Sequence, residues 1–147
     1  MKVKQRRDRE ASVKPRQIFI TEHDMTRLRS LIELGGVKDK PYLERLAEGL
    51  DKAKLVTPKQ VPEDVVTMNS VIRVKDLDTD EEKTYRLVFP AKAGAVDNAV
   101  SILGPMGTAL LGCREGETIE LDGPEGKKRL KVVELVYQPE RLGNYVL

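Results

Sequence analysis

The sequence predicts an α+β fold: a short N-terminal antiparallel helical hairpin followed by an antiparallel sheet wrapped on a short helix. Two observations lead to this prediction. Apolar residues recur at helical spacing in the first part of the chain, and from Val65 onward the pattern changes to the alternation typical of strands. In addition, the glycine pair Gly35-Gly36 separates two amphipathic segments, which favours an antiparallel hairpin.

The chain has 147 residues, room for about one domain of the usual size. With 34% charged residues and no apolar run near the ~20 residues of a membrane span, it is expected to be soluble and to have no membrane partner. The basic N-terminus is not followed by an apolar segment, which argues against a secretory signal. The single cysteine, Cys113, cannot form an internal disulfide. These features favour a reduced, cytoplasmic location.

Residues 1–16 form a basic tail with a net charge of +5, so residues 17–147 carry −3. The tail has almost no apolar side chains to bury and is predicted to be disordered. Its basic residues are Lys2, Lys4, Arg6, Arg7, Arg9, Lys14 and Arg16. Such a run is usually a solvated extension, and the alternative is an arm that makes weak contact with nucleic acid or with an acidic protein face.

Residues 17–57 are predicted to form a short helical hairpin. Thr21 is placed to cap the first helix, with Asp24 in the matching position of a capping box, and the glycine pair ends that helix. The second helix is predicted to begin near Pro41, because proline suits a first turn. Its apolar residues have the spacing of a truncated coiled coil, namely Leu43, Leu46, Leu50 and Ala53. At about 1.5 Å per residue, arms of about 13 residues reach roughly 20 Å.

Residues 61–147 are predicted to form a β-rich domain. Its strand-like runs are 71–74, 84–89, 100–103, 117–121 and 129–137. Alternation in the last run breaks at Val132-Val133. A short helix is predicted between Pro105 and Gly112, with proline near its start and glycine at its end. The acidic turn 76–82 has D-x-D-x-D spacing, but Glu81 and Leu87 stand where a calcium loop needs glycine and a bidentate glutamate, so no metal site is expected.

No catalytic constellation stands out in the sequence. The only histidine, His23, lies in the capping turn without the company that a metal site or a nucleophile needs. Cys113 has no histidine partner and is expected to be a packing residue. The Gly-x-x-Gly of residues 104–107 lacks the remainder of a phosphate-binding loop. No cofactor, metal or small-molecule substrate is therefore expected, and the chain is predicted not to be an enzyme.

Several stretches of the second segment resemble the C-terminal domain of the bacterial Gre transcript-cleavage factors. They are residues 76–88, the helix 105–112 and the run 132–137. Four further stretches are similar to the Rnk-type branch of this GreA/GreB family: 64–70 (DVVTMNS), 89–92 (FPAK), 109–112 (ALLG) and 137–140 (YQPE). The resemblance covers about residues 17–147, is densest from Val61 onward, and leaves out the basic tail.

The resemblance implies an FKBP-like C-terminal domain that docks on the rim of the RNA polymerase secondary channel, with the hairpin pointing inward. In the cleavage factors, acidic residues at the hairpin tip help to hold a magnesium ion that drives RNA cleavage. Here the tip offers one carboxylate, Asp39, beside Lys38, so cleavage is not expected. The predicted polymerase-binding residues are Pro105, Met106, Leu110, Leu111, Asp78 and Asp80. The two leucines are equally compatible with a place in the core.

The predicted function is a non-catalytic transcription regulator that binds RNA polymerase and competes with Gre cleavage factors without stimulating cleavage. Two alternatives stay open. A peptidyl-prolyl isomerase would follow from the FKBP-like fold alone, which is a weak basis, and the chain has few of the aromatic residues that line a proline pocket. A nucleic-acid binder, such as a DNA-binding protein, would use the tail of residues 1–16.

Overall fold

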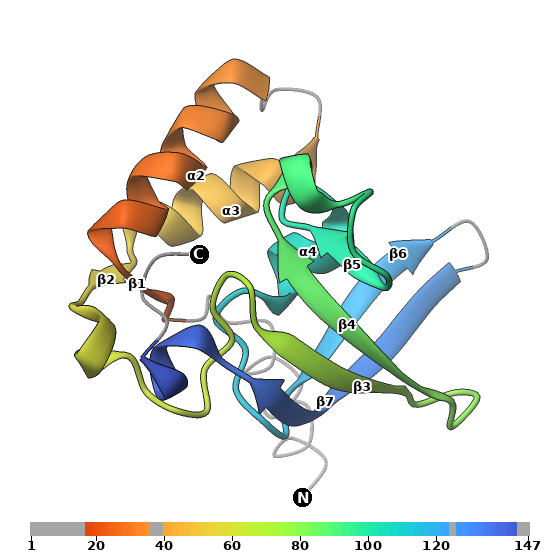
Figure 1. Cartoon of the computed structure of the whole chain (residues 1–147). Coiled ribbons are helices and arrows are strands. Elements are labelled where there is room, and N and C mark those ends of the chain that lie inside the picture. The colour runs from red at the N-terminus through yellow and green to blue at the C-terminus, as the bar shows by residue number, and fades with distance from the viewer. Residues whose placement is uncertain (1–16, 36–39, 124–125, 144–147) are drawn as a thin grey trace, which may run out of the picture.

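In the computed structural model of the chain, the described residues are 17–35, 40–123 and 126–143. Within these ranges a helical hairpin lies against one side of a sheet domain (Figure 1). None of the helices in these ranges is long and apolar enough to cross a membrane. The basic tail and the predicted hairpin tip, with Lys38 and Asp39, lie outside the described residues.

The hairpin begins with β1 (Phe19–Ile20), continues through α2 (Glu22–Gly35) and α3 (Pro41–Asp51), and ends with β2 (Lys54–Leu55). The Thr21 hydroxyl accepts a hydrogen bond from the Asp24 backbone N–H at 3.3 Å, at the helix start that the sequence predicts. β1 and β2 pair in parallel, so the two ends of the hairpin are tied together. This pair has no signal in the sequence, because strands of two residues leave no periodicity.

The second segment is a five-stranded sheet with strand order β5-β4-β3-β7-β6. Its strands are β3 (Val71–Asp76), β4 (Glu82–Val88), β5 (Ala99–Ser101), β6 (Thr118–Gly123) and β7 (Gly126–Tyr137). The short helix α4 (Pro105–Leu110) packs on the sheet, and three 3-10 turns lie at Pro58–Gln60, Pro90–Lys92 and Pro139–Leu142. The register of β7 against β3 shifts twice, once where Val132-Val133 breaks the alternation.

The prediction of an FKBP-like antiparallel sheet is wrong. β5 runs parallel to β4, with Arg86 opposite Ala99 and Val88 opposite Ser101. The chain leaves β4, passes through the turn Pro90–Lys92 and returns to enter β5 in the same direction. Side chains alternate with a period of two in parallel and antiparallel strands alike, so the sequence pattern carried no information about strand direction. The described domain is a mixed sheet preceded by a helical hairpin.

One hydrophobic core joins the hairpin to the sheet domain. The apolar residues of α3 that were assigned to a coiled coil, Leu43, Leu46 and Leu50, are buried in this core, and α3 lies against α4. The same core contains Met68, Leu87, Phe89, Ile102, Leu110 and Cys113 of the sheet domain. The truncated coiled coil is therefore not supported, because the helices bury their apolar faces on the sheet domain as well as on each other.

Candidate functional site

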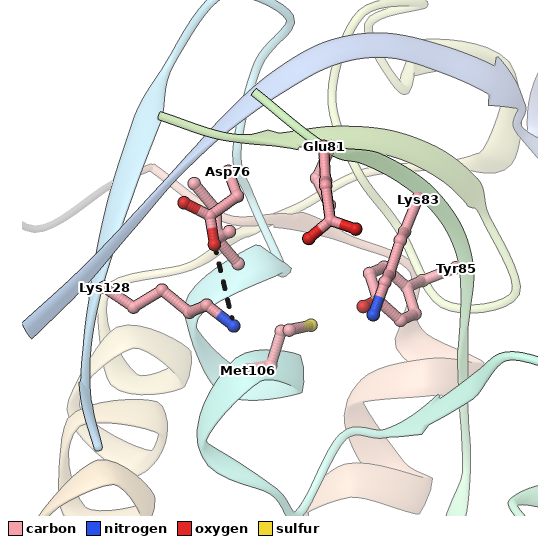
Figure 2. A pocket seen from close by; sticks show the side chains of 8 residues that line it. Asp76, Glu81, Lys83, Tyr85, Met106 and Lys128 are labelled. Carbon is pink, nitrogen blue, oxygen red and sulfur yellow. Dashed lines mark ion pairs between the residues drawn. The ribbon is translucent and has the colours of Figure 1, made fainter. Parts of the chain in front are cut away.

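A small pocket of about 40 Å³ lies between α4 and the face of the sheet that α4 covers. Four parts of the chain line it: β3, the turn into β4 with β4 itself, α4, and the start of β7. Its lining residues are Val74, Asp76, Glu81, Lys83, Tyr85, Met106, Lys128 and Leu130. Figure 2 shows Met106 between the side chains of Asp76 and Lys128 on one side and those of Lys83 and Tyr85 on the other.

Strand register brings the lining residues together. Val74 lies opposite Lys83 on β4, and Asp76 lies opposite Leu130 on β7. Residues opposite each other share a face of the sheet, and so do residues two apart on one strand. The apolar members of these pairs therefore form the floor of the pocket, while the charged members lie at its rim.

Close packing of α4 supplies the remaining wall. At Gly107, an added Cβ would stand 2.1 Å from the backbone oxygen of Ser101, so only glycine allows this approach. Pro105 is exposed at the first position of the helix, and Met106 is half-buried in the pocket. The helix thus presents an exposed proline and a methionine side by side at the pocket.

Basic side chains of β3 and β7 pair with the acidic turn beside the pocket. The carboxylates of Asp76, Asp78 and Asp80 face Lys128 at 3.7 Å, Arg129 at 3.8 Å and Lys75 at 3.5 Å, respectively. The backbone N–H of Asp78 donates to Asp76 and lowers the pKa of that carboxyl below its usual value; partial burial opposes this shift, and Lys128 reinforces it. Asp76 is thus held in its charged form, and the three basic partners offset part of the negative charge of the turn.

The structure separates the predicted binding residues into two groups. Leu110 and Leu111 are 0% and 3% exposed and lie in the core. Pro105, Asp78 and Asp80 are exposed, and Met106 lines the pocket that the acidic turn borders. Sequence reasoning missed Lys83, Tyr85 and Lys128. Residues 84–89 were predicted only as a strand, and the register that brings Lys128 of β7 to the pocket had no signal in the sequence.

A cation–π contact and a partly buried carboxyl lie where the hairpin meets the sheet domain. The guanidinium of Arg27 on α2 lies 3.7 Å from the ring centroid of Phe89. Within the sheet domain, Glu140 accepts a hydrogen bond from the Thr67 hydroxyl at 2.7 Å. Burial, followed by the charge of Glu140, raises the pKa of Asp24 on α2 to about 6. These residues are called the junction below, together with the shared core.

Within residues 17–35, 40–123 and 126–143, no group of three or more histidine, cysteine or acidic side chains is arranged to hold a metal ion. The carboxylates of the acidic turn pair with basic side chains instead, as described above.

Comparisons with known proteins match both segments of the chain. The family described as "Transcription elongation factor, GreA/GreB, C-term" matches residues 61–137, and "Rnk N-terminus" matches residues 16–56. Over 131 residues the chain is 38% identical to the regulator of nucleoside diphosphate kinase of Escherichia coli strain K12, covering 88% of this chain and 96% of that protein. Over 91 residues it is 35% identical to transcription elongation factor GreA of Clostridium kluyveri, covering 62% of this chain and 57% of that protein.

A solved structure described as a prokaryotic transcription elongation factor GreA/GreB from Nitrosomonas europaea is similar in fold. The two chains are 37% identical and superpose with a TM-score of 0.71, covering 84% of this chain and 100% of the other. This likeness supports a helical hairpin followed by a sheet domain and gives no support to an FKBP-like fold. The isomerase alternative, which depended on that fold alone, loses its basis.

The chain belongs to the GreA/GreB family of transcription elongation factors, in the branch of the Rnk-type regulators. It is a transcription factor related to the Gre factors.

Proposed function

We propose that this protein is a non-catalytic regulator that binds RNA polymerase at the rim of the secondary channel. It occupies the site of the Gre cleavage factors and does not stimulate RNA cleavage. The docking surface consists of Pro105, Met106 and the acidic turn with Asp78 and Asp80. Leu110 and Leu111 support this surface from the core without contacting the partner.

Membership of the family supports the choice of partner, since its members are elongation factors of transcription. The geometry supports the choice of surface. Pro105 and Met106 lie at the start of α4, and Asp76 and Glu81 of the acidic turn line the pocket beside Met106, whereas Asp78 and Asp80 lie outside its lining and pair with Arg129 and Lys75. Residues from distant parts of the chain thus line one pocket of mixed charged and apolar character, as is usual in protein interfaces.

The packing of the hairpin is the observation that supports a protein without RNA-cleavage activity. α2 and α3 have 14 and 11 residues, so at about 1.5 Å per residue the longer arm spans roughly 21 Å. Both helices are also fastened to the sheet domain, through the shared core and through Arg27 on Phe89. A short hairpin held in this way is poorly suited to carry a metal ion deep into a channel.

The experiment is a titration of Gre-stimulated RNA cleavage in a stalled elongation complex. Adding this protein is expected to inhibit cleavage, and adding more Gre factor is expected to restore it, because two proteins that share a site exclude each other. The amount needed follows the ratio of the two dissociation constants, in which a factor of ten corresponds to about 1.4 kcal/mol. The full chain is used, because residues 61–147 alone would lose part of the core.

Two results would contradict the proposal. Inhibition that excess Gre factor cannot reverse would show that the site is not shared. Faster RNA cleavage with this protein and magnesium alone, abolished in Asp39→Ala, would show that the hairpin is catalytic.

A further inference from the structure

We infer that the pocket beside Met106 takes a single apolar side chain of the polymerase, on a segment that also presents a basic group to Glu81 and an acidic group to Lys83. This inference rests on the proposed function, because it names the chemistry of the docking segment. The segment is protein rather than nucleic acid.

The floor of the pocket selects an apolar group. Val74 and Leu130 are buried beneath it, and Met106 and the ring of Tyr85 form its sides. Its volume of about 40 Å³ exceeds the roughly 10–15 Å³ that one water molecule needs. A cavity of that size with an apolar floor holds the end of one aliphatic side chain, which gains free energy by leaving water.

The charged residues at the rim of the pocket determine which residues can stand beside that apolar side chain in the docking segment. Two acidic and two basic residues surround the opening, so its formal charges cancel. Asp76, with 13% of its side chain exposed, already pairs with Lys128 at 3.7 Å. Within the part of the chain that the structure describes, neither Glu81 nor Lys83 forms an ion pair with another residue, and both are exposed.

Opposite charges at Glu81 and Lys83 specify a partner that offers both signs. The two residues are two positions apart, and Figure 2 shows both side chains at the same opening. Nucleic acid is disfavoured, because the carboxylates of Asp76 and Glu81 would repel phosphates at the opening. A protein segment with one basic and one acidic side chain beside an apolar one is complementary to this pattern.

The apolar part is tested by binding of Met106→Gln to purified RNA polymerase. Glutamine has nearly the length and flexibility of methionine but a polar end, so we expect the dissociation constant to rise about tenfold. Met25→Gln is the matched control, because Met25 is also half-buried but lies on α2. Its binding is expected to stay within twofold of the parent chain, and thermal unfolding of each variant verifies that it folds.

The charged part is tested by exchanging two residues. Glu81→Lys and Lys83→Glu are each expected to weaken binding three- to tenfold, and the double exchange at least as much. The double exchange leaves the net charge of the chain unchanged. If binding depended on net charge alone, the double exchange would restore it, and that result would overturn the inference. Glu120→Lys and Lys131→Glu are the controls, because both residues are exposed next to inward-facing Ile119 and Leu130 and therefore lie on the opposite face of the sheet.

The outcomes separate the inference from the proposed function. If the parent chain fails to bind polymerase at all, the proposed function and the inference both fail. If the parent chain binds and the folded pocket variants bind equally well, only the inference fails. A 20-base-pair DNA duplex is the further probe: binding to the duplex that Lys83→Glu abolishes would overturn the choice of a protein partner.

Discussion

The junction between hairpin and sheet and the pocket end of the sheet are built on different physical principles. At the junction, Leu28 and Leu50 are buried in a core shared by both segments, and Arg27 covers an aromatic ring. At the pocket end, contacts are mainly between exposed charges, such as Arg129 with Asp78 at 3.8 Å. Burial of one large apolar side chain contributes about 1.5–3 kcal/mol, whereas an exposed ion pair contributes about 0–1 kcal/mol.

If the pocket end is the docking surface, as proposed, this difference lets one small protein combine a fixed shape with an adaptable surface. The junction holds the hairpin in place because disrupting it exposes apolar area to water. The exposed ion pairs of the pocket end, such as that of Arg129 with Asp78, can exchange partners at little cost and without unfolding the sheet. Stability and binding are therefore expected to respond to different substitutions.

The largest effect is expected from Leu50→Ala. Leu50 is 1% exposed on α3, and removal of a buried leucine side chain costs about 2–5 kcal/mol of unfolding free energy. Chemical denaturation measures the change. Leu55→Ala is the control, because Leu55 on β2 is 57% exposed and its truncation is expected to cost less than about 0.5 kcal/mol. Equal losses in both variants would contradict the assignment of stability to the junction.

A smaller and pH-dependent effect is expected from Asp24→Asn. The pKa of Asp24 is raised from 3.8 to about 6 by burial and by Glu140, so the folded chain binds this proton more tightly than the unfolded chain. Ionised Asp24 therefore destabilises the fold above about pH 6, and this cost disappears as the pH falls toward 4. At pH 8 the variant is expected to be more stable by on the order of 1 kcal/mol, with partial exposure reducing the full effect.

Unfolding free energies of the parent chain and Asp24→Asn, measured between pH 4 and pH 8, provide the test. The advantage of the variant is expected to shrink as the pH falls from 8 to 4. Glu22→Gln is the control, since Glu22 is an exposed acidic residue in the same helical turn. A constant difference across this range would show that Asp24 is not protonated within the junction.

The smallest effect on stability is expected from Pro105→Arg at the pocket end. Pro105 is exposed, so the unfolding free energy is expected to change by less than about 0.5 kcal/mol. Polymerase binding is nevertheless expected to weaken, because a long cationic side chain would project from the docking surface. Pro58→Arg, which alters another proline at the start of a helical turn, is the control in the same binding assay. Unchanged binding of Pro105→Arg would remove this surface from the proposal.

Local signals predicted most of the individual elements. Thr21 marks the start of α2, Pro41 is the first residue of α3, and Pro105 is the first residue of α4, because caps and prolines act within one turn of the chain. The irregularity at Val132-Val133 corresponds to a register shift in β7. The candidate site was predicted only in part, because Lys83 and Lys128 join it through strand pairing over long distances in the sequence.

The sequence by itself determined the order of the helices and of the five longer strands, the starts of the helices, and membership of the family, since each depends on residues close together or on matched stretches. The tertiary structure alone decided three further features. They are the parallel direction of β5, the packing of α3 on the sheet domain, and the pairing of the acidic turn with β7. The physical reason is that each depends on which segments meet in space, through backbone pairing for β5, apolar area for α3 and charge for the acidic turn. Periodicity tells which side of an element is buried but not what covers it.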